Sequence, residues 1–249
     1  MHIDELPVWA LQITGPKTDI ADAKLIFGAA SDPSIISFTE TGGDEITLLI
    51  SPQFEALNVA QEVNDIAQRL LGVVNGLLFV VEPGRTPLVG GGIRKRSPSG
   101  LWGYHLIAAS GLIIARGRAR GVGVAIVGGV ASPEHMRPPA YVRWAAAAQS
   151  DQVVADVMIY LSGDPDWFDY YKAFELMRDD INRRLGQHQE HTMGWPPKKD
   201  VDHFKLSAQV YRHAPPWDGG YSPAKALSLG QSARFIHLLA DKWLTWRFP

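Results

Sequence analysis

The sequence predicts an α+β protein with a β-rich N-terminal part and a helical C-terminal part. Residues 1–132 are rich in glycine and carry short apolar runs between turn residues, which is typical of strands. Residues 140–249 instead carry apolar residues at helical spacing. A segment with three prolines, residues 133–139, separates the two parts. We therefore expect a β-rich α+β domain over residues 1–132, with one long helix, and a helical domain, or a helical extension packed on the first domain, over residues 140–249.

The first fifty residues predict a strand, a short helix and a hairpin. Val8–Thr14 is a short apolar segment followed by Gly-Pro, which indicates a strand that ends there. Asp19–Phe27 is compatible with a short helix capped by Asp19. The β-rich runs Ile35–Thr41 and Glu45–Ser51 flank a Gly-Gly-Asp turn, and this arrangement predicts a β-hairpin.

The middle of the first part predicts one long helix and several strands. Apolar residues recur at helical spacing over Gln53–Asn75, and the apolar run Gly76–Val81 that follows indicates a buried strand. Pro87–Gly100, with three consecutive glycines, is expected to be a loop. Leu101–Arg120 alternates like a long hairpin, and Gly121–Val130 is β-branched like an inner strand.

The C-terminal part predicts helices throughout. Ala140–Leu161 is alanine-rich and is expected to be helical, in one or two pieces. The next helix is expected to start after Asp164, as its cap, and to run to Leu185 before a glycine. Two further helices are predicted over Lys199–His213 and Ser228–Trp246, the latter capped by its serine.

Composition narrows the function classes. Apolar residues make up 46% of the chain, charged residues 20%, and the net charge is −2, so no global basic surface for nucleic acid is expected. The absence of cysteine excludes disulfides, cysteine-ligated metals and thiol nucleophiles. The N-terminus lacks the basic region of a signal peptide, and the longest apolar run, Leu70–Val81, is about twelve residues where a membrane span needs roughly twenty. We expect a soluble, cytoplasmic protein without a membrane partner.

A row of arginines is the clearest candidate for ligand binding. In a strand, Arg116, Arg118 and Arg120 would point to one face, where three guanidinium groups could hold a phosphate or an acidic partner. A neighbouring basic triplet in the glycine-rich loop could extend the patch. The alternative is a solvated strand face, or an edge whose charge prevents strand pairing. The predicted anion-binding patch comprises Arg94, Lys95, Arg96, Arg116, Arg118 and Arg120.

A polar cluster is the second candidate. Glu175 and Asp179 are four residues apart on a predicted helix, so their carboxylates would project side by side, and Lys172 precedes Glu175 by three. Such a pair could bind a metal or act as acid and base. The alternative is a set of intrahelical ion pairs on a solvated face beside an aromatic core stripe. The predicted cluster comprises Tyr171, Lys172, Glu175, Asp179 and His203.

Neither a metal site, a cofactor site nor a catalytic residue is assigned from the sequence. His188 and His191 have a spacing that two zinc ligands on a helix could use, but the intervening residues do not match the H-E-x-x-H pattern and the segment reads as a loop. Solvated or hydrogen-bonding histidines are the simpler interpretation. The glycine-rich segments fit neither the phosphate-loop nor the dinucleotide fingerprint, and no G-x-S-x-G elbow is present.

The last third of the chain resembles the C-terminal part of uncharacterised bacterial proteins. The segments that carry the resemblance, over about eighty residues, are Asp166–Glu175, Gly194-Trp195, Phe204–His213 and Ala233–Leu244. The resemblance implies a bacterial origin and no activity.

These observations favour a non-catalytic ligand-sensing or protein-interaction module that recognises an anionic ligand or partner. Tyrosine, tryptophan and arginine on the last helices would supply a second recognition face. One alternative is a metal-dependent hydrolase or nuclease-like enzyme that uses Glu175, Asp179 and one or two of His188, His191 and His203. Another is a structural subunit of a homo-oligomer or larger complex.

Overall fold

The computed structural model describes residues 8–28, 31–40, 43–98, 101–105, 140–187, 189–212 and 223–249. These residues form one antiparallel sheet and a set of helices, which confirms the predicted α+β class. The strands are β1 (Trp9–Thr14), β2 (Ser34–Thr39), β3 (Glu45–Ile50), β4 (Val89–Arg96) and β5 (Trp102–His105), in the sheet order β2-β3-β1-β4-β5. The helices are α1 (Lys17–Ile26), α2 (Ala60–Val81), α3 (Ala140–Ser150), α4 (Gln152–Leu161), α5 (Trp167–Leu185), α6 (Lys198–Arg212) and α7 (Leu229–Arg247). Short 3₁₀ turns are η2 (Pro52–Phe54), η3 (Glu190–Met193) and η5 (Pro223–Lys225).

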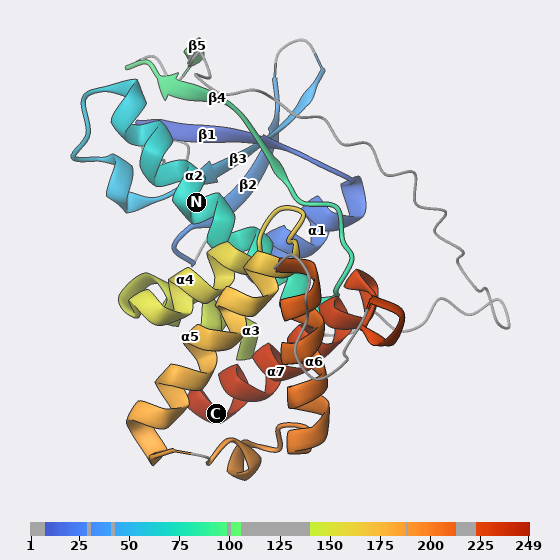
Figure 1. Cartoon of the computed structure of the whole chain (residues 1–249). Helices are drawn as coiled ribbons and strands as arrows, with labels where there is room; N and C mark the ends of the chain where they lie inside the picture. The colour runs from blue at the N-terminus through green and yellow to red at the C-terminus, as the bar shows by residue number, and fades with distance from the viewer. Residues whose placement is uncertain are drawn as a thin grey trace, which may run out of the picture.

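The sheet lies at one end of the molecule and the C-terminal helices at the other, with α2 between them (Figure 1). One continuous cluster of buried apolar side chains extends from the sheet through α2 into α5 and α7, and it includes Leu11, Leu70, Phe174 and Trp243. The two parts that the sequence distinguishes thus share a core. The proline-rich boundary predicted between them, residues 133–139, lies outside the described residues.

The predicted strand β1 and the predicted β2–β3 hairpin are confirmed, with Ser34 opposite Ile50 and Thr39 opposite Glu45. The sheet is strongly curled. Phe38 on β2 and Trp102 on β5 belong to the two edge strands, which would lie about 19 Å apart in a flat sheet of this order. Their ring centroids are nevertheless 6.4 Å apart. The concave face therefore encloses a second, smaller apolar cluster, in which Leu48 is completely buried.

The loop predicted for Pro87–Gly100 is wrong over most of its length, because Val89–Arg96 is strand β4. Side chains from other elements fill the space beside its glycines. A Cβ atom on Gly92 would lie 2.3 Å from the ring of Tyr104, and one on Gly90 would lie 2.7 Å from the side chain of Gln68. These glycines allow neighbouring side chains to cross the strand closely, a use of glycine in strands that a turn-based prediction misses.

The boundaries predicted around α2 are also wrong. The helix begins at Ala60 rather than Gln53, and it continues through Gly76–Val81, where a strand was expected. The reason is that this run is buried between the sheet and the C-terminal helices, and a continuous apolar run does not distinguish a buried strand from a buried helix. Among the described residues, α2 is long and apolar enough to cross a membrane, but 67% of its most apolar window is buried inside the protein, as in a core helix.

Two glycines bring α2 unusually close to α4. Gly72 and Gly76 are four residues apart, and therefore lie on one face of α2. A Cβ atom on Gly76 would lie 2.1 Å from the carbonyl oxygen of Met158, and one on Gly72 would lie 3.4 Å from Ile159. Small residues at this spacing allow two helix backbones to approach each other closely.

One of the three predicted helix N-caps is confirmed and two are wrong. Ser228 caps α7 in a capping box, as predicted. The predicted cap of α1 is wrong, because α1 starts at Lys17 and Asp19 lies inside its first turn, where its carboxylate is 3.4 Å from Arg85. The predicted Asp164 cap of α5 is also wrong. Asp166 accepts hydrogen bonds from two amides of the first turn instead, and Gly186 ends the helix as predicted.

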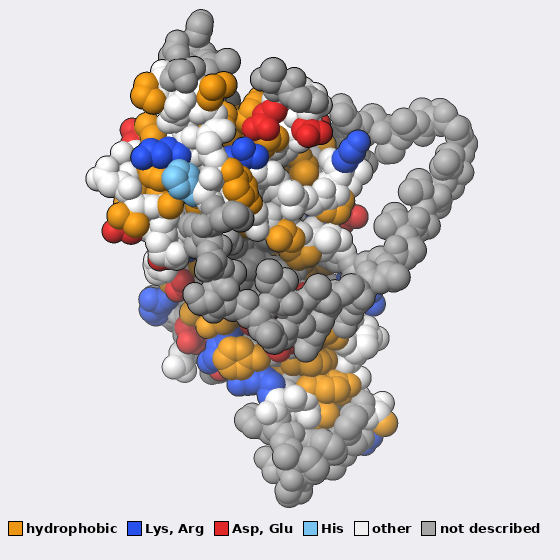
Figure 2. Space-filling model, turned by 90° about the horizontal axis from the view of Figure 1, so that it is seen from above, with side chains coloured by type: hydrophobic (Ala, Val, Ile, Leu, Met, Phe, Trp, Pro, Cys, Tyr) orange, Lys and Arg blue, Asp and Glu red, His pale blue; other side chains and the backbone are white. Residues whose placement is uncertain are grey.

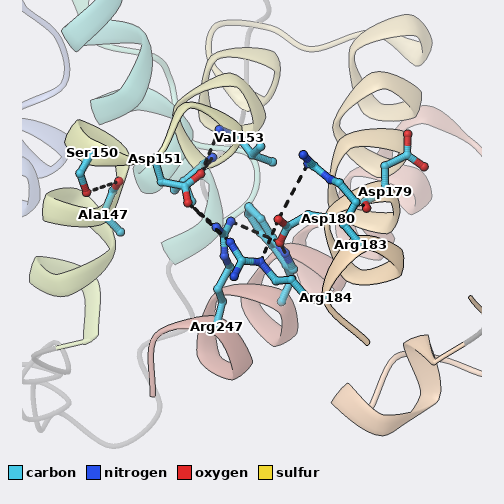
Figure 3. A network of polar contacts seen from close by, with 11 residues as sticks. Ala147, Ser150, Asp151, Val153, Asp179, Asp180, Arg183, Arg184 and Arg247 are labelled. Atoms are coloured by element: carbon cyan, nitrogen blue, oxygen red, sulfur yellow. Dashed lines mark hydrogen bonds and ion pairs between the residues drawn. The ribbon is translucent and has the colours of Figure 1, made fainter. Parts of the chain in front are cut away.

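The predicted helical segment Ala140–Leu161 consists of two pieces, α3 and α4, joined at Asp151. The Asp151 carboxylate caps α4 and also pairs with Arg247, in the last turn of α7. Asp180 on α5, whose side chain is 4% exposed, lies 3.2 Å from the same arginine. Trp243 Nε1 donates to Asp180 at 3.0 Å, and Arg184 Nε does so at 3.1 Å. Figure 3 shows the two carboxylates facing Arg247 from different helices, so this network fastens α4, α5 and α7 together.

Candidate functional site

Three of the six residues of the predicted basic patch lie among the residues that the structure describes. Arg116, Arg118 and Arg120 lie outside the described residues, whereas Arg94, Lys95 and Arg96 lie on β4. Arg94 donates to Gln12 at 2.9 Å, pairs with Glu40 at 3.3 Å and stacks on Tyr104. The charge of Arg94 is therefore largely neutralised within the sheet.

Lys95 points to the opposite face of β4 from Arg94 and Arg96, because successive strand residues alternate. Its Nζ lies 4.5 Å from the centre of a Trp9 ring. Figure 2 looks onto the sheet end of the molecule, and in the described part of that face, basic side chains alternate with acidic and apolar ones. These three cations thus do not form a single-sign patch among themselves.

The predicted polar cluster on α5 and α6 does not converge on one cavity. Lys172 donates to Glu175 at 2.9 Å, and this hydrogen bond is the main reason that the pKa of Lys172 is raised. Asp179 is 62% exposed and lies 3.5 Å from Arg178. The imidazole of His203 lies 2.9 Å from the backbone oxygen of Lys225. Tyr171 packs beside Phe174 instead, with a ring-centroid distance of 6.0 Å.

No three His, Asp or Glu side chains come together as a metal site within the described ranges, from which His188 is missing. His191 lines the cleft described next. The structure therefore brings the predicted polar residues to separate places.

A cleft of about 650 Å³ opens between the C-terminal half of α5, η3 and the N-terminal half of α6. Phe174 and Trp195 form its aromatic wall, with ring centroids 6.0 Å apart. Both side chains are buried: Phe174 is completely buried and Trp195 is 6% exposed. Val201 continues this apolar surface on α6. We call this cavity the α5–α6 cleft.

Local sequence signals shape the cleft. Gly186 ends α5 with a positive φ of 89°, and Gly194 ends η3 in the left-handed region at 71°. Glycine suits both positions because it has no Cβ atom to clash there. Met193 and Trp195, on either side of the second glycine, are both buried and fix the connection to the core. Two prolines, Pro196 and Pro197, then lead directly into α6.

Three cationic side chains, Arg178, Lys198 and Lys205, line the cleft together with two carboxylates, Glu190 and Asp202. Asp202 faces two lysines, with Lys198 bonded to one carboxylate oxygen and Lys205 3.8 Å from the other. The hydrogen bond from Lys198 is the main reason that the pKa of Asp202 is lowered. Arg178 lies 5.4 Å from the centre of the Phe174 ring, and it is 3.5 Å from the carboxylate of its exposed neighbour Asp179.

Two buried polar atoms in the wall of the cleft have no hydrogen-bond partner among the described residues. They are the indole N–H of Trp195, a donor, and the side-chain oxygen of Asn182, an acceptor. Buried polar groups are usually satisfied, because leaving one unpaired costs about 1–3 kcal/mol.

The sequence did not identify this cleft. Lys198, Asp202 and Lys205 have the i, i+4, i+7 spacing of one helix face, and Arg178 follows Phe174 by four, so each half of the cleft carries a readable signal. Their meeting depends on how η3 turns the chain back, which no local pattern specifies. No protein-family model, curated protein or solved structure matches the chain.

Proposed function

We propose that this protein is a non-catalytic ligand-sensing or interaction module that binds a small organic anion in the α5–α6 cleft. The observation that carries the proposal is the combination of a buried aromatic wall, Phe174 and Trp195, with an arginine, Arg178, in the lining of the same cleft. The volume of about 650 Å³ falls within the range of sites for small molecules, roughly 300–1,000 Å³.

The chemistry of the lining indicates a ligand with two different ends. A flat apolar body would pack against the Phe174 and Trp195 rings and remove apolar area from water. A carboxylate or phosphate would be held by Arg178, whose planar guanidinium can donate two parallel hydrogen bonds. Lys205 adds a second positive charge, because the single carboxylate of Asp202 is shared between two lysines. On sequence grounds, Arg116, Arg118 and Arg120 are proposed as a second anion-binding element of the same module.

The geometry gives less support to a hydrolase or nuclease. Such an enzyme needs its carboxylates and imidazoles within reach of one reacting atom. Glu175 is paired with Lys172, Asp179 faces solvent beside Arg178, and His203 contacts a backbone carbonyl. None of these three side chains lines the α5–α6 cleft.

A thermal-shift screen followed by calorimetry tests the proposal. The probes are aromatic carboxylates such as indole-3-acetate, nucleoside monophosphates, and neutral analogues of the same rings. A ligand at one hundred times its Kd should stabilise the folded state by about 2.7 kcal/mol and raise the Tm accordingly. We expect a shift with an anionic aromatic probe and little shift with its neutral analogue.

Arg178→Gln should weaken that binding at least tenfold, because it removes a charge-assisted hydrogen bond. Arg234→Gln is the matched control, since Arg234 is an exposed arginine on α7 outside the cleft. Equal binding by wild type and Arg178→Gln, or no Tm shift with any aromatic anion, would contradict the proposal.

A further inference from the structure

A second exposed surface lies at the other end of the α5–α6 pair. It consists of residues from the start of α5 and the end of α6, which we call the aromatic patch: Trp167, Phe168, Tyr171, Tyr211 and Arg212. Phe168 and Tyr211 are each 47% exposed, a large fraction for aromatic side chains. The rings of Trp167 and Tyr211 are stacked, with centroids 4.7 Å apart and planes at 13°.

Arg212 is the charged centre of the aromatic patch. Its guanidinium carbon lies 4.2 Å from the centre of the Tyr171 ring and 5.6 Å from that of Phe168. Stacking on ring faces restrains the guanidinium and leaves its N–H edge available for hydrogen bonds. No carboxylate among the described residues lies within ion-pair distance of Arg212.

The nearby carboxylates are engaged elsewhere. Asp166, beside the patch, accepts hydrogen bonds from the amides of Phe168 and Asp169, at 2.7 and 3.2 Å, and so caps α5. Asp169 accepts in turn from the amide of Asp166 at 3.0 Å. Glu175 is bonded to Lys172. Amide hydrogen bonds leave the carboxylates of Asp166 and Asp169 charged, but neither carboxylate pairs with Arg212, so the edge of the guanidinium is left for an incoming acceptor.

A hollow of about 440 Å³ adjoins Arg212 and is lined by Asp166, Trp167, Phe168, Tyr211 and Arg212 itself. It suits one apolar side chain from a short extended or helical segment. Tryptophan, tyrosine and arginine are the residue types that most often dominate the energy of such contacts.

We propose that the aromatic patch docks a short acidic segment of a partner protein. A carboxylate of the segment binds the free edge of the Arg212 guanidinium, and a neighbouring apolar side chain enters the hollow against Trp167 and Tyr211. The patch shares no lining residue with the α5–α6 cleft, so this inference does not depend on the ligand proposed there.

Peptide binding to the full chain provides the test. An array of dodecapeptides that combine Glu or Asp with Leu, Phe or Trp is probed first, beside an array in which Lys replaces each acid. The best acidic peptides are then labelled with fluorescein and titrated by anisotropy. We expect saturable binding of acidic peptides, weakened at least tenfold when Gln replaces Glu, because a hydrogen bond to a charged group is lost.

Variants locate the binding surface. Arg212→Gln should also weaken binding at least tenfold, Arg212→Lys should weaken it less, and Arg234→Gln should leave it unchanged. Phe168→Ala removes one ring of the aromatic patch and should weaken peptide binding. Since Phe168 is half exposed, the substitution should leave the fold intact, which an unchanged Tm would verify. Failure of every acidic peptide to bind, undiminished binding to Arg212→Gln, or preferential binding of basic peptides, single-stranded oligonucleotides or anionic vesicles would overturn the inference.

Discussion

The carboxylate of Asp180 should be among the strongest single contributors to stability in the helical part. Its side chain is 4% exposed and faces Arg247, whose side chain is 5% exposed, at 3.2 Å. It also accepts hydrogen bonds from Trp243 and Arg184. Asp180→Ala would leave an indole N–H without a partner and would deprive a buried guanidinium of one of its two carboxylates.

The expected loss can be worked from these contacts. Removing one partner of a buried ion pair costs about 3–5 kcal/mol, and a buried donor left unsatisfied costs about 1–3 kcal/mol. The two costs do not add, because Arg247 and Trp243 share the same carboxylate and Arg247 keeps its contact with Asp151. We therefore expect Asp180→Ala to lower the free energy of unfolding by about 3–5 kcal/mol. Asp180→Asn, which retains an acceptor for Trp243, should cost less.

Urea denaturation followed in parallel by tryptophan fluorescence and circular dichroism measures this effect. Coincident transitions are required, because a chain of 249 residues need not unfold in two states. Asp179→Ala is the matched control, since Asp179 is the adjacent carboxylate and is 62% exposed. A change within about 1 kcal/mol for Asp180→Ala, or equal changes for both variants, would refute the argument that the buried network carries the stability.

Three further variants test the packing and the electrostatics. Gly76→Ala should lower the free energy of unfolding by about 3 kcal/mol or more, because its new methyl group would overlap the Met158 carbonyl. Gly230 has open space around it, so Gly230→Ala should change the free energy of unfolding by less than about 1 kcal/mol. Equal thermal midpoints for the two variants would count against the close approach of α2 and α4. Because the pKa of Asp202 is lowered in the folded state, its carboxylate contributes stability above the unfolded pKa, and this stability is lost as pH falls through the folded pKa. The Tm of wild type should therefore exceed that of Asp202→Asn near neutral pH, and the two Tm values should converge in acid. Partial burial raises the pKa of Asp169, so the effect of this carboxyl group on stability has the opposite sign: it is present at low pH and is lost as pH rises through the folded pKa. Asp169→Asn should therefore gain stability relative to wild type as pH rises. A constant difference in Tm across the acid range would show that the residue does not titrate as inferred.

Elements with a strong local signal could be predicted from the sequence. The β2–β3 hairpin follows from its Gly-Gly-Asp turn, and α7 follows from Ser228, whose hydroxyl accepts from the amide of Gln231. Elements that depend on distant partners could not. Strand β4 contains three glycines, and the role of Gly90 and Gly92 becomes clear only once Gln68 and Tyr104 are seen to lie against them. The apolar end of α2 is helical because of where it is buried, which its composition does not reveal.

The same distinction applies to the sites. The sequence singled out Tyr171 and His191, and the structure places each at the edge of a candidate binding surface. It placed Tyr171 beside Glu175 and Asp179 because residues four apart share a helix face, and it offered His191 as a possible partner of these carboxylates in an enzyme. The grouping that the structure shows instead crosses from α5 to α6, as with Trp167 and Tyr211, and such contacts leave no fixed spacing in the chain.

The contact between α2 and α4 also has an evolutionary consequence. Because the Met158 carbonyl occupies the place where a side chain on residue 76 would begin, any related protein that keeps this packing should keep glycine at that position, however far the rest of its sequence has diverged. The exposed residues of α2 are free to vary. A distant relative would then be recognised by a small pattern: a glycine in an apolar helix, followed at the appropriate distances by the equivalents of Asp180, Trp243 and Arg247.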